Sequence, residues 1–263
     1  MLAVSCFAVQ HGGEATRLTA PSFFDAPGFD SSSMPASEYG WHQLPVPSGR
    51  CLDSSLKTSQ LHADQWALEV AEARTGSCLT NGFYVDVGSN NGYRISNTYP
   101  LDVYQSWSGL CIDPFPTNMT QRTCSLAQAV VLDVDGQEVS FEHSDDEFGV
   151  MGGVADIMSG HDKGSKSSSA RTYHFKTSTL ASIFTSHGVP PVVDFMSLDV
   201  EGAELKALHG IDHARFCARA IAVEHNFLEP DRSQMRTLLQ GLGYVYAGSE
   251  QFDDYYERNC NGA

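Results

Sequence analysis

The sequence predicts an α/β fold with a mostly parallel sheet flanked by helices. Short β-rich segments alternate with helix-like stretches along most of the chain, and several of them end at a glycine, a proline or an acidic residue. This alternation is typical of βαβ units, in which a helix connects two parallel strands. The 263 residues suffice for one such domain with a full core and an extra terminal segment.

The predicted domain begins after an irregular arm. Residues 1–57 are rich in serine, proline and glycine, so we expect an irregular or partly disordered segment there. Residues 58–263 form the predicted domain. Its first element is a helix over 60–74, where apolar residues fit a helical spacing and Thr75-Gly76 supplies a stop. That helix is expected to pack on the sheet.

The remaining elements follow from runs of β-branched and aromatic residues and from the turns between them. Residues 93–104 are helix-like up to Pro100, and a helix over 203–208 is capped by Gly210. Residues 143–171 lack periodicity and predict a long mobile loop, a class often used as a lid or binding loop. Strands are expected at 82–88, 108–113, 128–133, 138–141, 192–199 and 220–224, and near 244–246 and 254–256.

The charge balance argues against polyanionic partners. The chain has 32 Asp and Glu against 16 Lys and Arg, a formal net charge of −16. Such a chain repels nucleic-acid phosphates and anionic membrane surfaces, so we expect no nucleic-acid substrate. No apolar run approaches the roughly 20 residues needed to span a bilayer. The acidity itself is explained by solubility.

The cysteines predict neither a disulfide framework nor a zinc site. Their number is seven, and they include no Cys-x-x-Cys pair and no Cys/His cluster. The apolar opening residues 1–9 lack a positively charged leading segment, so we expect a cytoplasmic protein. An Asn118-Met119-Thr120 glycosylation triplet would matter only in another compartment.

The first informative motif is a glycine turn directly after a predicted strand. Asp86, Gly88 and Gly92 have the spacing Asp-x-Gly-x-x-x-Gly, which differs from the Gly-x-Gly-x-x-Gly that seats a dinucleotide pyrophosphate. Glycine permits both a tight turn and a close approach of a ligand to the backbone. An acidic residue here suits a positive or hydroxyl-rich ligand. With Ser89 and Asn90, these residues are the candidate cofactor site.

A second acidic residue ends the next predicted strand. Asp113 stands where a carboxylate can accept hydrogen bonds from both hydroxyls of a ribose. The turn alone is equally consistent with a structural role, because sharp strand-to-helix turns are glycine-rich in many folds. Together, the turn and Asp113 favour a nucleoside ligand without a required phosphate.

These residues resemble the FkbM methyltransferase family. The matching runs are 82–92, 96–99, 107–114 and 197–205, the last of which contains an Asp-Val-Glu-Gly-x-Glu segment and is followed by Leu208 and Gly210. The resemblance extends from about residue 60 to about 258. It implies a class I, Rossmann-like methyltransferase fold, S-adenosylmethionine as methyl donor, and a hydroxyl of a small molecule or a sugar (glycan) as acceptor. It also implies that Asp86, Gly88 and Gly92 line the methionine end of the cofactor and that Asp113 binds the ribose. Family members often have Glu at position 113 and Asp at position 91.

Further carboxylates follow the strand predicted over 192–199. Asp199 stands at its carboxyl end, where open α/β sheets bind ligands, and is a candidate for both cofactor binding and catalysis. Glu201 is as consistent with catalysis as with a structural role. Glu204 is better explained by the favourable interaction of an acid with a helix amino terminus.

The strand over 220–224 leads into Glu224-His225-Asn226 at the same edge. His225 is our preferred general base, because histidine titrates near neutral pH and the reaction removes a proton from an alcohol. The alternative is that His225 faces the other side of the strand and only packs there. A divalent cation on Asp199, Glu224 and Asn226 is a further alternative, although we predict no metal site.

Two other functions remain open at this point. A nicotinamide-dependent oxidoreductase would use the same general fold, but the missing Gly-x-Gly-x-x-Gly and the presence of Asp86 argue against it. A non-catalytic nucleoside-binding module is also compatible, because a fold does not guarantee its activity.

Overall fold

A computed structural model describes residues 44, 48, 51–52, 59, 61–144, 152–161 and 170–260. The described residues all belong to one compact unit, residues 41–263. Leu44 and Leu52, from the predicted arm, are buried in its core. The folded unit therefore includes part of the predicted arm, and the rest of that arm lies outside the described residues.

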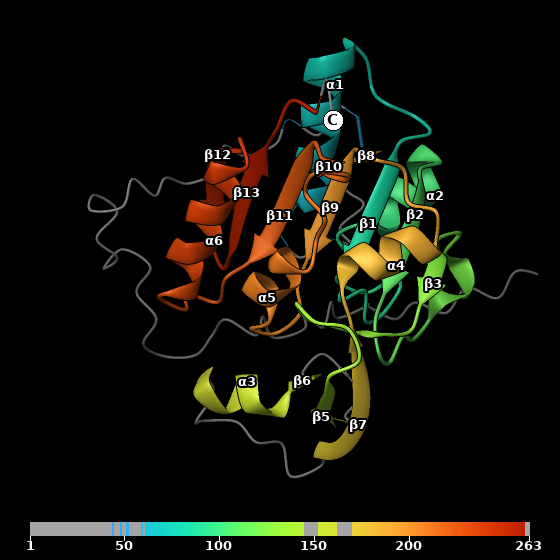
Figure 1. Cartoon of the computed structure of the whole chain (residues 1–263). Coiled ribbons are helices and arrows are strands. Elements are labelled where there is room, and N and C mark those ends of the chain that lie inside the picture. The colour runs from blue at the N-terminus through green and yellow to red at the C-terminus, as the bar shows by residue number, and fades with distance from the viewer. Residues whose placement is uncertain are drawn as a thin grey trace, which may run out of the picture. The chain divides into compact units, whose positions relative to one another are not determined.

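The described elements, drawn in Figure 1, confirm the alternation of strands and helices. In chain order they are α1 (Ala63–Thr75), β1 (Phe83–Val87), α2 (Tyr99–Gln105), β2 (Ser108–Ile112), the 3-10 helix η2 (Met119–Gln121), β3 (Ser125–Ala127), β4 (Val130–Val131), β5 (Glu138–Ser144), β6 (Gly152–Val154), α3 (Ala155–His161), β7 (Ala170–Ser178), α4 (Leu180–Ser186), β8 (Val192–Val193), β9 (Phe195–Leu198), α5 (Glu204–His209), β10 (Cys217–Ala218), β11 (Ala220–Glu224), α6 (Asp231–Gly241), β12 (Val245–Glu250) and β13 (Asp253–Glu257).

The main sheet has seven strands in the order β12-β13-β11-β9-β1-β2-β3. Strands β3, β2, β1, β9 and β11 are parallel to their neighbours in this series. Strand β13 is inserted antiparallel between β11 and β12. The sheet is therefore mostly parallel, as the sequence predicts.

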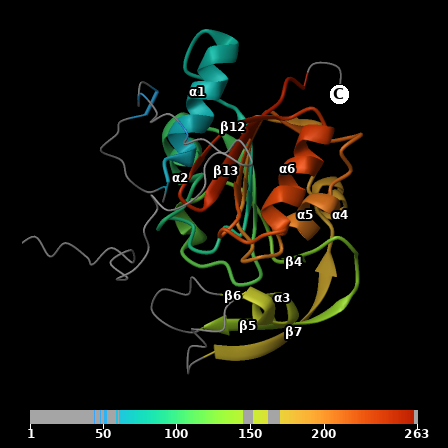
Figure 2. The same ribbon diagram turned by 90° about the vertical axis from the view of Figure 1, so that its left-hand side faces the viewer.

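Different helices cover the two faces of this sheet, as Figure 2 shows edge-on. Strand side chains alternate between the faces. Val85 and Val223 belong to a buried cluster with residues of α4, α5 and α6, whereas Tyr84 and Ala222 belong to one with α1 and Leu101 of α2. We call these sides the α6 face and the α1 face.

A second, smaller sheet has the strand order β4-β7-β5-β6. The strand predicted over 128–133 is wrong in detail, because β3 ends at Ala127 in the main sheet and β4 pairs with β7 in the small one. The loop predicted over 143–171 is also wrong in part, since it contains β6 and α3 and the ends of β5 and β7. Residues 145–151 and 162–169 lie outside the described residues.

Helix α2 differs from the predicted helical segment 93–104. It begins at Tyr99, so Pro100 opens the helix instead of interrupting it. Proline is favoured in a first turn, where its missing N–H has no partner to lose. The preceding residues 88–98 are consequently free to form the long turn after β1.

Three disulfides contradict the expectation that a disulfide framework is absent. They join Cys51 to Cys78, Cys111 to Cys124 and Cys217 to Cys260, which are 27, 13 and 43 residues apart. No short spacing motif announces such pairs, because folding alone brings the partners together. Disulfides persist in oxidising compartments and are rare in the cytosol, so this finding argues against the expected compartment. Cys6 lies outside the described residues.

No helix in the described ranges has both the length and the apolar character that crossing a membrane requires.

Candidate active site

Strand register fixes which side chains meet at the carboxyl edge of the main sheet. Asp86 of β1 pairs with Cys111 of β2 and with Ser197 of β9, and Ser197 pairs with Ala222 of β11. Cys111 and Ala222 are buried on the α1 face, so the other two residues of this level project there as well.

The next level toward the edge is a row of carboxylates. Two residues beyond each position of that level, the chain has an acid directly after β2, directly after β9 and at the last residue of β11, and it has glycine directly after β1. Side chains two apart along a strand share a face, and β13 adds an acid directly opposite Glu224. We call the set the acidic row; its members are Asp113, Asp199, Glu224 and Asp253, with Gly88 between the first two.

Gly88 is required by its surroundings. Its φ is +85°, and a Cβ atom built on it would lie 1.6 Å from the carbonyl oxygen of Asp199. Its N–H donates to the Ile112 carbonyl at 2.8 Å. A side chain would therefore collide with the neighbouring strand before it met any ligand. At Gly92 a Cβ would lie 2.6 Å from Met119 Sδ, so that glycine allows η2 to pack on the turn.

Asp113 holds the turn through its carboxylate. Its Oδ2 accepts a hydrogen bond from the Asn90 N–H at 2.8 Å, and its Oδ1 accepts one from the Phe115 N–H at 2.6 Å. The side chain is buried, and burial raises the pKa of Asp113 above its usual value despite these hydrogen bonds. Each oxygen keeps acceptor capacity, because a carboxylate offers about four lone-pair positions.

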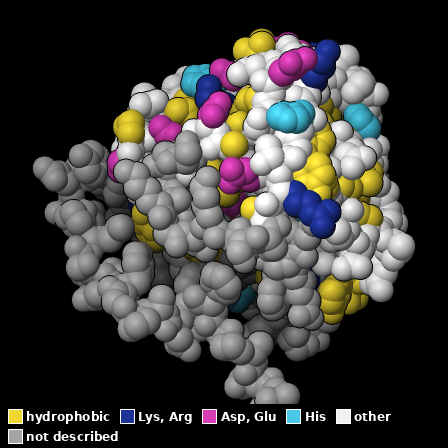
Figure 3. Space-filling view, turned by 90° about the horizontal axis from the view of Figure 1, so that it is seen from below, with side chains coloured by type: hydrophobic (Ala, Val, Ile, Leu, Met, Phe, Trp, Pro, Cys, Tyr) yellow, Lys and Arg dark blue, Asp and Glu magenta, His cyan; other side chains and the backbone are white. Residues whose placement is uncertain are grey.

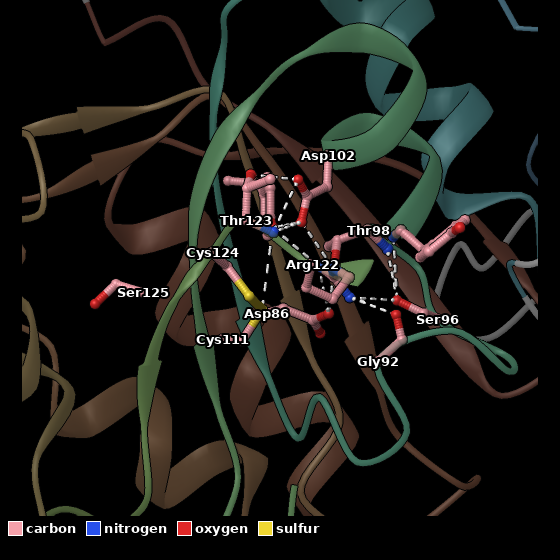
Figure 4. The surroundings of a disulfide bond; sticks show 12 residues. Asp86, Gly92, Ser96, Thr98, Asp102, Cys111, Arg122, Thr123, Cys124 and Ser125 are labelled. Atoms are coloured by element: carbon pink, nitrogen blue, oxygen red, sulfur yellow. Dashed lines mark hydrogen bonds and ion pairs between the residues drawn. A yellow bond between two sulfur atoms is a disulfide. The ribbon is translucent and has the colours of Figure 1, made fainter. Parts of the chain in front are cut away.

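Asp86 lies one level deeper than the acidic row. It accepts a hydrogen bond from the Thr98 hydroxyl, and its Oδ2 is 3.8 Å from the guanidinium of Arg122. Only 4% of Asp86 is exposed, and burial raises its pKa. Asp86 therefore contacts protein groups that shape the turn, as Figure 4 shows.

Two other residues of the turn differ in their bonding. Ser89 Oγ is buried and lacks a hydrogen-bond partner within the described part of the chain. The Asn91 side chain instead accepts hydrogen bonds from the N–H groups of Tyr93 and Arg94, at 3.1 and 3.0 Å. Asn91 thus stabilises the turn locally, whereas Ser89 retains an unused hydroxyl.

Asp199 and Glu224 form a carboxyl pair. Burial raises the pKa of Asp199 to about 6, partly offset by a hydrogen bond with Glu224. Burial and the charge of Asp199 raise the pKa of Glu224 well above its usual value. Asn226 donates to Glu224 Oε2 at 2.7 Å. Both carboxyl groups therefore bind a proton more tightly than exposed carboxyl groups do.

Glu204 and Glu201 have different places in the turn before α5. Glu204 Oε1 accepts hydrogen bonds from the N–H groups of Val200 and Gly202, at 2.9 and 3.1 Å, so it has a structural role in the turn before α5. Burial raises its pKa to about 7. Glu201 is partly buried and adopts φ 56°. Its Cβ is 3.5 Å from the position that a Cβ would take if Gly153 of β6 had one.

His225 lies on the opposite face from Glu224, since consecutive residues of a strand point to opposite sides. Its side chain is fully buried, with Nε2 3.5 Å from Asp254 Oδ1 and Nδ1 accepting a hydrogen bond from the Phe227 N–H. Burial, followed by the charge of Arg232, lowers the pKa of His225 to about 2. The structure therefore does not bring His225 together with Asp199 and Glu224.

Sequence reasoning missed Asp253 of the acidic row and the whole environment of Arg122. Asp253 is buried, and burial with the nearby charge of Asp199 raises its pKa well above the usual value. A signal existed in the run Asp253-Asp254, because two acids in a β-rich segment are unusual unless both have a purpose. Arg122 carried no such signal.

Aromatic residues of the small sheet lie near Asp113. Phe115, two residues after it, stacks on His143 of β5 with ring centroids 4.2 Å apart and also contacts Tyr173 of β7. Figure 3 views the molecule from this side and shows charged side chains of both signs among hydrophobic ones.

Comparison with known protein families matches residues 86–246 to the methyltransferase FkbM domain. This match covers more than half of the chain and includes the glycine turn, Asp113, the acids that follow β9, and Glu224 at the end of β11. The chain belongs to the FkbM methyltransferase family. No curated protein and no solved structure matched it. The glycine turn, Asp113, Asp199 and Glu224 lie within the matched range, whereas Asp253 lies beyond its end.

Proposed function

We propose that this FkbM domain is a class I, Rossmann-like methyltransferase that uses S-adenosylmethionine to methylate a hydroxyl oxygen of a small molecule or a sugar. The observation that carries the proposal is the alignment of Asp113, Gly88, Asp199 and Glu224 on one face of the carboxyl edge of the sheet. Helices on both faces of a mostly parallel sheet support the fold assignment.

The residues of the turn suit this cofactor. Asp113 retains acceptor positions for ribose hydroxyls, and the buried Ser89 hydroxyl lacks a partner among the described residues. The acidic row provides negative charge for a ligand with a sulfonium and an ammonium group. Gly88 leaves the space between Asp113 and Asp199 without a side chain. We assign Asp113, Ser89, Asn90 and Asp199 to cofactor contact, and Asp86, Gly88 and Gly92 to shaping the turn.

We propose that Asp199 and Glu224 act together as the general base. Bound S-adenosylmethionine would supply an electrophilic methyl group. The carboxyl pair accepts the proton that the acceptor hydroxyl loses as its oxygen attacks, and the raised pKa values of both carboxyl groups make them stronger bases than exposed carboxylates. Asn226 keeps Glu224 in place through its hydrogen bond. His225, with a pKa lowered to about 2, is a poor base at neutral pH and is assigned to packing.

A divalent cation is a second interpretation of the same carboxylates. Oxygen atoms of Asp199, Glu204 and Glu224 lie within 4.8 Å of one another, a spacing that one cation can bridge. If the carboxyl pair acts as base, methyl transfer survives a chelator and rises with pH through a single step. If a cation activates the hydroxyl, the chelator abolishes transfer and magnesium or manganese restores it.

The experiment is calorimetric titration of the full, oxidised chain with S-adenosylmethionine, S-adenosylhomocysteine and NAD. We expect the first two to bind and NAD not to bind. If neither of the first two binds, the proposal fails, and binding of NAD alone favours an oxidoreductase. Transfer from labelled cofactor into metabolite and glycan pools identifies the acceptor. Cofactor binding without transfer to any pool favours the binding module.

A further inference from the structure

Arg122 occupies the centre of a buried polar network beside the glycine turn (Figure 4). It follows η2, and its side chain is 1% exposed. All five of its N–H donors are used. They donate to Asp102 Oδ2 at 2.8 Å, the Gly92 carbonyl at 3.1 Å, Ser96 Oγ at 3.1 Å, the Tyr84 hydroxyl at 2.9 Å and Thr98 Oγ1 at 2.6 Å.

Three of these acceptors, Gly92, Ser96 and Thr98, belong to the segment 88–98 that forms the proposed cofactor turn. Thr98 also donates to Asp86, so one hydroxyl links the guanidinium to the acid at the end of β1. A planar guanidinium with fixed donor directions holds several acceptors in one geometry, which lysine cannot do.

The segment that carries Arg122 is itself anchored. Thr117 N–H donates to the Asn90 carbonyl, and Gly92 N–H donates to the Thr117 carbonyl, both at 2.9 Å. Two residues after Arg122, Cys124 is bonded to Cys111 of β2. The disulfide closes the loop 111–124, which bears both Asp113 and Arg122. The loop thus fixes the ribose-binding acid and the turn in one unit.

We propose that Arg122 is a positioning residue for cofactor binding: through Gly92, Ser96 and Thr98 it holds the glycine turn in the conformation that receives the cofactor. This inference rests on the proposed function. Its energetic role differs from that of an ordinary buried ion pair, because its hydrogen bonds reach the backbone and hydroxyls of the turn as well as carboxylates.

The chain offers a matched control on the α6 face. Arg232 is buried and forms a two-point ion pair with Asp254, at 3.0 and 2.7 Å. Arg122→Gln and Arg232→Gln each leave a buried carboxylate without its charged partner, so both lower thermal stability. Only Arg122→Gln is expected to weaken S-adenosylhomocysteine binding, by at least about tenfold. Arg122→Lys is expected to recover stability more than affinity.

Hydrogen exchange separates this inference from the proposed function, because it needs no ligand. In ligand-free Arg122→Lys the amides of Gly92 and Asp102 are expected to exchange faster, whereas those of α6 are not. Unchanged exchange together with unchanged affinity overturns the positioning role. If the unaltered chain does not bind S-adenosylhomocysteine, the proposed function fails, while faster exchange at the turn still supports the mechanical role of Arg122. If Arg122→Gln does not fold, the affinity and hydrogen exchange of Arg122→Lys test the positioning role instead.

A separate observation concerns Asn118 on the same loop. Asn118 and Thr120 are exposed, and Asn118 adopts φ 50° in the turn before η2. The triplet Asn118-Met119-Thr120 has the acceptor pattern for asparagine glycosylation. Three disulfides indicate the oxidising compartment in which that modification occurs in eukaryotic cells.

We propose that Asn118 is an N-glycosylation site. A membrane-bound oligosaccharyl transferase would join Asn118 Nδ2 to the first sugar carbon of a lipid diphosphate-linked oligosaccharide. The C–N bond forms as the sugar–phosphate bond breaks, the amide loses one proton, and the lipid diphosphate leaves. The exposed turn presents the side-chain amide without unfolding the domain.

The test is secretion of the full chain from a eukaryotic host, followed by mass measurement before and after amidase deglycosylation. We expect one glycan, lost in Asn118→Gln and Thr120→Ala and retained in Thr120→Ser. Absence of a mass shift in secreted chain that carries all three disulfides overturns the proposal. A shift that persists in Asn118→Gln overturns it as well.

Discussion

The two faces of the main sheet use similar residues for different purposes at the same edge. On the α1 face, Asp199 and Glu224 lie side by side and share a high affinity for protons. On the α6 face, Asp254 is paired with Arg232, and His225 beside it is held neutral by burial. Glu224, part of the proposed base, and His225, which packs on the other face, are consecutive residues of the chain.

The difference teaches that the surroundings of a residue, and not its ordinary pKa, decide its suitability as a base. An exposed histidine titrates near neutral pH and an exposed carboxylate well below it. At this edge the order is reversed, because burial penalises the charged form of each group. Histidine becomes harder to protonate and the carboxylates become easier to protonate.

We expect the largest effect on turnover from substitution of Glu224, the acid that the comparison of the two faces sets against His225. Glu224→Gln removes a proton acceptor and is expected to lower turnover about 10²–10⁴-fold, with a smaller effect on S-adenosylhomocysteine affinity. The matched variant His225→Gln is expected to keep its turnover and lose stability. Single-turnover methyl transfer with and without chelator is the measurement. The opposite pattern would restore His225 as the base.

The next effect concerns the cofactor itself. Asp113→Ala removes the acceptor for the ribose hydroxyls and for two backbone N–H groups of the turn. We expect a loss of about 1–3 kcal/mol, or roughly 5–150-fold in affinity. Asp254→Asn, on the other face, is the control and should leave affinity unchanged. Calorimetry on both folded variants checks this, and equal affinities would refute the ribose assignment.

A third prediction uses pH to compare the binding of S-adenosylmethionine, which carries a sulfonium, with that of S-adenosylhomocysteine, which carries a neutral thioether. Because the pKa of Asp199 is raised to about 6 in the folded chain, its carboxyl is protonated below that pH. Affinity for S-adenosylmethionine should therefore fall by up to about tenfold per pH unit below 6, while that for S-adenosylhomocysteine falls less. Parallel titrations from pH 5 to 8 test it, and identical profiles would argue against a charge contact.

The same raised pKa has a consequence for stability. A folded carboxyl that binds its proton more tightly than the unfolded one stabilises the fold below the ordinary pKa near 4. That contribution is lost as pH rises through about 6. Asp199→Asn should flatten this part of the dependence of unfolding free energy on pH, measured by denaturant unfolding without ligand.

The smallest effect that we expect is the difference in stability between the loss of one disulfide and the loss of another. Loop-closure entropy predicts about 3 kcal/mol for the bond between Cys111 and Cys124 and about 4 kcal/mol for the one between Cys217 and Cys260, which closes a longer loop. Serine replacement of the second pair should cost more stability. Replacement of the first should weaken cofactor affinity a few-fold, because that loop carries Asp113. Equal affinities in both variants would contradict this coupling.

Sequence reasoning predicted the fold because its signals are local. The β1 segment ends in Asp86-Val87-Gly88, and the segments that became β2, β9 and β11 each run into an acid, so the alternation of strands and the carboxyl edge were both visible. The family resemblance over 60–258 agrees with the matched range 86–246. The mistakes at 128–133 and 143–171 arose where short strands change sheets, a property of pairing that no window of sequence contains.

The sequence predicts where candidate site residues stand along the chain, but it does not predict to which face of the sheet each side chain points. The sequence indicates Asp199 and His225 as candidates and Glu224 only as a possible cation ligand, and the face that each occupies depends on the register of β9 against β11. Arg122 was invisible, because a single arginine in a polar segment gives no signal until folding surrounds it with five acceptors. The disulfides were missed for the same reason.

The position of β13 has a consequence for biosynthesis. It is the last described strand to leave the ribosome, yet it lies inside the sheet between β11 and β12. Until residue 257 is available, β11 has an open edge and β12 has no partner, and both are surfaces on which other chains can form sheet. Arrival of β13 closes that edge and delivers Asp253 in the same event. Completion of the acidic row thus coincides with protection from aggregation.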